Sequence, residues 1–75
     1  MNTTQCNMVL DYMRQFGAIT QLEAIRDIGC MRLAARISEL RERGYAIDRR
    51  MKTSKNRYGK DVSFAEYYLI KEDSI

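Results

Sequence analysis

The sequence predicts an α+β fold in which three helices are followed by one β-hairpin. Two patterns carry the prediction. Apolar residues recur at helical spacing in three segments before Gly44, and after it they alternate at the spacing of a strand. Gly17, Gly29 and Gly44 follow the three helical segments, as glycines do where helices end in the left-handed conformation.

The first helix is expected to run from Thr3 or Thr4 to Phe16. One face of this segment is apolar, and we expect it to pack inward: Cys6, Val9, Leu10, Met13 and Phe16. Ala18 and Ile19 then form an extended link that is long enough for one short strand.

We place one domain at residues 4–71, with flexible termini at 1–3 and 72–75.

The stretch from Thr20 to Gly44 has the sequence form of a helix-turn-helix. Thr20 and Glu23 have the spacing of a capping box, which predicts a second helix from Gln21 to about Asp27. Its inward side is expected to hold Leu22, Ile25 and Ile28.

A third helix is expected to open near Cys30 or Met31 and to end at Gly44. The face of this helix opposite its apolar stripe is cationic near the helix start and has a small residue, Ala35, at its middle. Such a face suits entry into a DNA major groove, where arginines reach base edges. The predicted DNA-reading residues are Met31, Arg32, Ala35, Arg36 and Ser38. A solvated charged face on a core helix is the alternative interpretation.

The segment after Gly44 predicts a basic hairpin. YAIDRRMKT and VSFAEYYLI have strand patterns, and SKNRYGK between them is rich in turn formers. Arg49 to Lys60 holds six basic residues and no acidic one, so a polyanion would relieve their repulsion. The predicted wing and phosphate contacts are Arg49, Arg50, Lys52, Lys55, Asn56, Arg57 and Lys60. Alternatively, the lysines protect an edge strand against aggregation.

One apolar core is predicted from the helical stripes and one face of the last strand. Tyr67 and Leu69 are expected to pack on the helices, although a slip of one residue would exchange the strand faces. The predicted core comprises Val9, Leu10, Met13, Leu22, Ile25, Leu33, Ile37, Leu40, Ile47, Tyr67 and Leu69.

Composition argues against several function classes. The chain has no His, its acidic residues are scattered, and Cys6 and Cys30 form no metal-ligand spacing, so we expect no enzyme, no metal and no cofactor. No apolar run is long enough for a membrane span and the N-terminus lacks a signal-peptide pattern, which predicts a cytoplasmic protein with reduced thiols. Residues 32–60 hold ten basic and three acidic residues, a concentration that suggests an anionic partner.

The run ITQLEAIRDIGCMRLAARISELRERGYAI, with KNRYGK and YYL downstream, resembles small helix-turn-helix domain proteins of bacteriophages and bacteria, of the winged helix-turn-helix type. The resemblance spans about Gln5 to Leu69, and GCMRLAARISELRERGY is its most specific part. It implies a winged-helix fold, in which the hairpin tip is the wing, and DNA binding. The winged-helix ending of the third helix maps to Ile37, Leu40, Arg41 and Gly44.

The predicted function is sequence-specific binding of double-stranded DNA by a small phage or prophage transcriptional regulator. Two alternatives stay open at this point. One is a winged-helix protein-binding module that inhibits or modulates a host complex for nucleic-acid handling or defence. The other is an excisionase-like architectural DNA-binding factor. A homodimer and a host protein are the partners considered besides DNA, and RNA has weaker support.

Overall fold

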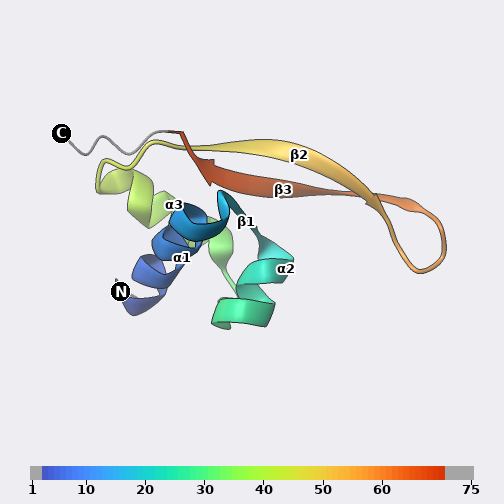
Figure 1. Ribbon diagram of the computed structural model, residues 1–75, viewed down its shortest axis with the longest axis horizontal. Helices are drawn as coiled ribbons and strands as arrows, with labels where there is room; N and C mark the ends of the chain where they lie inside the picture. Colours follow the sequence, from blue (N-terminus) through green and yellow to red (C-terminus); the bar gives the residue numbers. More distant parts are fainter. Residues whose placement is uncertain (1–2, 71–75) are drawn as a thin grey trace.

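The computed structural model describes residues 3–70, and its elements follow the predicted order (Figure 1). They are α1 (Thr3–Phe16), β1 (Ala18–Thr20), α2 (Gln21–Glu23), η1 (Ala24–Ile28), α3 (Leu33–Glu42), β2 (Ile47–Lys55) and β3 (Asp61–Leu69). α2 and the π-helical η1 are consecutive and form one helical segment. The structure confirms the predicted α+β arrangement of three helical segments and a C-terminal hairpin. Of the termini predicted to be flexible, only Thr3 is described, and it begins α1.

The three strands form one antiparallel sheet in the order β1-β3-β2. β1 pairs only with the end of β3, from Ala18↔Tyr68 to Thr20↔Glu66. β2 pairs along the whole of β3, from Ile47↔Leu69 to Lys55↔Asp61. Residues 51–65, which we call the arm, therefore continue beyond β1 as a two-stranded ribbon that projects from the helices (Figure 1).

The core lies between the helices and the base of the sheet. Its buried residues are Cys6, Val9, Leu10, Met13, Ile19, Ala24, Cys30, Leu33, Ile37, Leu40 and Ile47. Tyr67 and Leu69 pack against this cluster, as predicted. The register explains why, because Tyr67 lies opposite Ile19, Leu69 lies opposite Ile47, and directly opposed residues share a face of the sheet.

Three residues predicted to pack inward are on the surface, and the first is Phe16 at the end of α1, which is 68% exposed. Leu22 is 70% exposed and Ile25 is 42% exposed, while Ala24 is fully buried and Ile28 packs against the core. The prediction assumed α-helical rotation, but η1 has the wider π turn, in which the Gly29 N–H reaches the Ala24 carbonyl. Ala24 faces the core, so Leu22, two residues earlier in α2, lies on the opposite side of the segment. Gly29 ends the segment with a φ of 81°.

The second helical segment begins as predicted from the sequence, with a capping box. The Glu23 N–H donates to Thr20 Oγ1 at 3.2 Å, and the Thr20 N–H donates to Glu23 Oε1 at 3.0 Å, which is the predicted capping box. At the other end, Tyr12 Oη of α1 donates to Asp27 Oδ2 at 2.7 Å. The Arg26 guanidinium and the Tyr12 hydroxyl lower the pKa of Asp27 to about 2. The second helical segment is thus tied to the sheet at one end and to α1 at the other.

Candidate nucleic-acid interface

The helix predicted to read DNA begins later than expected. α3 starts at Leu33, with Arg32 as its N-cap, so the prediction of an opening near Cys30 or Met31 was wrong. The reason is that the Cys30 side chain is fully buried in the core, and the chain between Gly29 and Arg32 makes a non-helical turn to place it there. Met31 and Arg32 therefore lie in the turn and at the cap, where both are exposed.

Arg36 does not point to solvent as predicted. Its side chain is 14% exposed and its Nε lies 3.3 Å from Glu39 Oε1, an ion pair without hydrogen-bond geometry. Cys6 Sγ of α1 donates to the same oxygen at 3.0 Å. The Cys6 hydrogen bond and the Arg36 charge hold the pKa of Glu39 below its usual value. α1 therefore engages the flank of α3 that carries Arg36 and Glu39.

The other flank of α3 is open. Ala34 and Ser38 are exposed, whereas Ala35, which we expected at the centre of the outer face, is half-buried. Ala34 was not among the predicted site residues. The apolar stripe alone could not identify it, because the open flank is decided by where α1 and the hairpin lie relative to α3.

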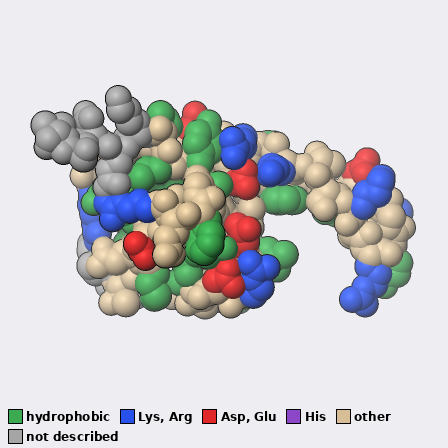
Figure 2. Space-filling view, viewed as in Figure 1, with side chains coloured by type: hydrophobic (Ala, Val, Ile, Leu, Met, Phe, Trp, Pro, Cys, Tyr) green, Lys and Arg blue, Asp and Glu red, His purple; other side chains and the backbone are tan. Residues whose placement is uncertain are grey.

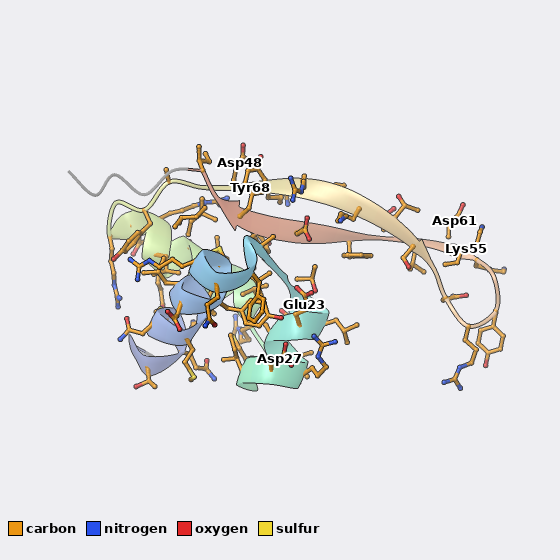
Figure 3. The ribbon with its side chains drawn as sticks, in the orientation of Figure 1. Glu23, Asp27, Asp48, Lys55, Asp61 and Tyr68 are labelled. Atoms are coloured by element: carbon orange, nitrogen blue, oxygen red, sulfur yellow. The ribbon has the colours of Figure 1, made fainter. Side chains whose placement is uncertain are left out.

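Half of the predicted basic residues of the hairpin have acidic partners. Arg50 Nε lies 2.7 Å and Lys52 Nζ 3.8 Å from Glu66 Oε1 on the facing strand. The Arg50 guanidinium also lies 4.7 Å from the centre of the Tyr68 ring. Lys55 was predicted to contact phosphate, but its Nζ lies 2.8 Å from Asp61 Oδ1 near the end of the arm (Figure 3). A phosphate would have to compete with these carboxylates.

Four predicted cations have no acidic side chain within ion-pair distance among residues 3–70. They are Arg32 at the start of α3, Arg49 at the base of the hairpin, and Arg57 and Lys60 in its turn. All four are exposed. Basic side chains are visible at the far end of the arm (Figure 2). These four are the groups best prepared to meet an anion, since no ion pair must first be broken.

The turn at the end of the arm has a defined geometry. Asn56 Oδ1 accepts from the Tyr58 N–H at 2.9 Å and from the Lys60 N–H at 3.1 Å. The Asn56 N–H donates to the Lys60 carbonyl at 2.9 Å, and Gly59 takes a φ of 78°. The side-chain oxygen of Asn56, a residue that we predicted to contact phosphate, therefore holds the loop that presents Arg57 and the 81% exposed Tyr58.

A groove of ≈ 500 Å³ lies between α2, the first turn of α3 and the hairpin. In the space-filling view the molecule is hollowed beneath the arm (Figure 2). The groove is lined by Thr20, Gln21, Leu22, Glu23, Arg26, Ala34, Lys52, Phe64, Ala65, Glu66 and Tyr67. Ala34 of α3 and Lys52 of β2 both border it, so the start of α3 and the basic hairpin share one concave surface.

The described part of the chain holds no group of three or more His, Cys, Asp or Glu side chains placed for a metal ion. Within residues 3–70, no helix has the length and apolar character needed to cross a membrane.

A family model described as a winged helix-turn-helix domain matches residues 4–72. Neither curated proteins nor solved structures gave a match to the chain.

Proposed function

The chain belongs to the winged helix-turn-helix domain family, and from that premise we propose that it is a sequence-specific double-stranded DNA-binding protein. One observation carries the proposal beyond the family: the first turn of α3 and the basic hairpin border the same groove. A duplex that lies across this groove would meet both elements at once. Winged helix-turn-helix domains are typically non-enzymatic, and the proposal requires no catalytic group.

In the proposed complex, the start of α3 enters the major groove and the arm grips the backbone beside it. Arg32 and Ser38 are the exposed polar residues of α3 and its cap that we assign to base edges, and Ala34 allows close approach. Arg49, Arg57 and Lys60 are assigned to phosphates, because they are exposed cations without an acidic partner among the described residues. Arg36 is assigned to packing between α1 and α3.

Replacing Arg32 with Ala should lower affinity for the preferred duplex by about 1–3 kcal/mol and relax the preference at one or two base pairs. The preferred duplex is obtained by selecting from a pool of random duplexes with the wild-type chain. Binding is then measured on that duplex and on a scrambled one. Arg14→Ala on α1 is the matched control and should change neither affinity. Equal losses on both duplexes would place Arg32 on a phosphate and remove it from base readout.

We further propose a regulatory role in a phage or prophage, with two copies bound to adjacent half-sites. One recognition helix contacts only a few base pairs, and half-sites about one helical turn apart supply the missing specificity. An inverted repeat upstream of the gene would support a repressor. Sedimentation and footprinting with the selected duplex should show two chains on one site. A single chain that protects one short site would contradict the paired arrangement and leave an excisionase-like architectural role as the better proposal.

A second candidate function is supported by apolar residues on the surface. Leu22 and Met31 are 70% and 71% exposed, and Ile25 is 42% exposed, near the same helix-turn-helix. Large apolar side chains on a surface can mark a protein interface when they form one patch, and these three lie within 10 residues of one another in the sequence. The candidate is a module that inhibits or modulates a host complex for nucleic-acid handling or defence. Capture of host proteins from a lysate that survives nuclease treatment would support it, and capture abolished by nuclease supports DNA binding.

A further inference from the structure

Gln21, the first residue of α2, uses both ends of its side chain to join α2 to the start of α3. Its Nε2 donates to the Cys30 carbonyl at 2.9 Å. Its Oε1 accepts from the Leu33 N–H at 3.0 Å. The two bonds therefore span the turn that carries Met31 and Arg32, from the residue before it to the residue after it.

The bond to Leu33 supplies the hydrogen-bond partner that the Leu33 N–H at the start of α3 otherwise lacks. The first N–H groups of a helix have no partner within the helix and are usually capped by a nearby side chain. The N-cap residue Arg32 makes no side-chain cap, and Leu33 is fully buried, so its N–H has little access to water. The Gln21 amide takes the place of the missing cap, and it comes from the preceding helix rather than from the chain next to α3.

Gln21 is itself held firmly. It follows Thr20, which is paired with Glu66 of β3 and closes the capping box with Glu23. A continuous series of contacts therefore runs from the hairpin through β1 and Gln21 to the cap of α3. The turn residues themselves are exposed, and Arg32 has no acidic partner among the described residues. The direction in which Arg32 leaves the protein surface depends on where Gln21 holds the two ends of the turn.

We propose that Gln21 is a positioning residue for base readout, which fixes Arg32 and the first turn of α3 relative to the hairpin. The inference rests on the proposed DNA-binding function. Each polar atom of the Gln21 amide already has a hydrogen-bond partner within the protein, so we assign Gln21, although it borders the groove, to positioning Arg32 and not to reading bases directly. Contacts of the arm with phosphates should not depend on it.

The test compares Gln21→Met with wild type on the selected duplex and on a scrambled duplex. Met keeps the length of the side chain and removes both hydrogen bonds. We expect the ratio of selected to scrambled affinity to fall about fivefold or more, with binding to the scrambled duplex and its salt dependence unchanged. The Leu33 amide should also exchange faster with deuterium. Gln15→Met is the matched control, because Gln15 is exposed on α1, and it should alter none of these quantities.

Gln21→Glu separates the two bonds. Its carboxylate still accepts from the Leu33 N–H and suits the positive end of a helix, but it cannot donate to the Cys30 carbonyl. We expect the Leu33 amide to stay protected from exchange. The ratio of selected to scrambled affinity should lie between the ratios of wild type and Gln21→Met. An unchanged affinity ratio in Gln21→Met, beside a wild-type chain that prefers its selected duplex, overturns the proposal for Gln21 alone. A wild-type chain without any preference overturns sequence-specific binding, and the readout role of Gln21 with it.

Discussion

Ile37→Ala is expected to lower the free energy of unfolding by about 2–5 kcal/mol, a large share of what a domain of this size possesses. Ile37 is 1% exposed and belongs to the buried stripe of α3 that faces the core. Truncation leaves a cavity that the helices on either side cannot fully close. Urea denaturation, monitored by circular dichroism, measures this change in the free energy of unfolding.

The neighbouring Ser38→Ala is the control, because Ser38 is exposed on the same helix. Its effect on unfolding should stay within about 0.5 kcal/mol. A melting temperature of Ile37→Ala that equals that of wild type would mean that α3 presents a different face to the core.

Replacing Arg49, Arg57 and Lys60 together with Ala should weaken binding to selected and scrambled duplexes alike. Each lost phosphate contact reduces the slope of log K against log salt by roughly 0.9, so the triple variant should flatten it by about 2–3. These three cations are exposed and have no acidic partner within the described chain, so each is available to release a counterion. A salt titration on both duplexes measures the slope.

The matched control removes the same charge from Arg50, Lys52 and Lys55. These side chains are already paired with Glu66 and Asp61, so the slope should change less than in the first triple variant. Equal changes in the two variants would show that net charge, and not the choice of cation, governs binding. If neither variant altered binding to any duplex, the basic surface would not be a DNA site and the protein-docking function would be favoured.

The parts of the fold that the sequence predicted are those set by local chemistry. The Thr20–Glu23 capping box depends on two residues three positions apart, and it is present as expected. The turn at Gly59 and the two flanking strands follow from turn-forming and β-branched residues in adjacent segments. Even the short β1 follows from the extended link before a helix cap.

The predictions were wrong where packing between elements far apart in the sequence decides which side chains are exposed or paired. Ala24 and Ile28 are the residues of the second helical segment that face the core, so Leu22 and Ile25 lie outside it, and the π turn in η1 was not predicted. Arg36 lies on the side of α3 that engages α1, a fact about packing and not about the helix itself. The acidic partners of Arg50 and Lys55 became visible only with the register of β2 on β3. The sequence therefore predicted where the basic segments lie more reliably than which of their side chains have acidic partners.

The arm sets a spacing between the two proposed contact regions. From Met51↔Ala65 to Lys55↔Asp61 its strands pair with each other, while β1 pairs with β3 only at residues 66–68. A strand advances about 3.3 Å per residue, so two residues added to each strand would carry the tip roughly 7 Å further without changing which faces its side chains occupy. One residue added to each strand would instead turn the tip cations to the opposite face. The distance between bases met by α3 and phosphates met by the tip can thus be changed in steps of two residues, while the core stays the same.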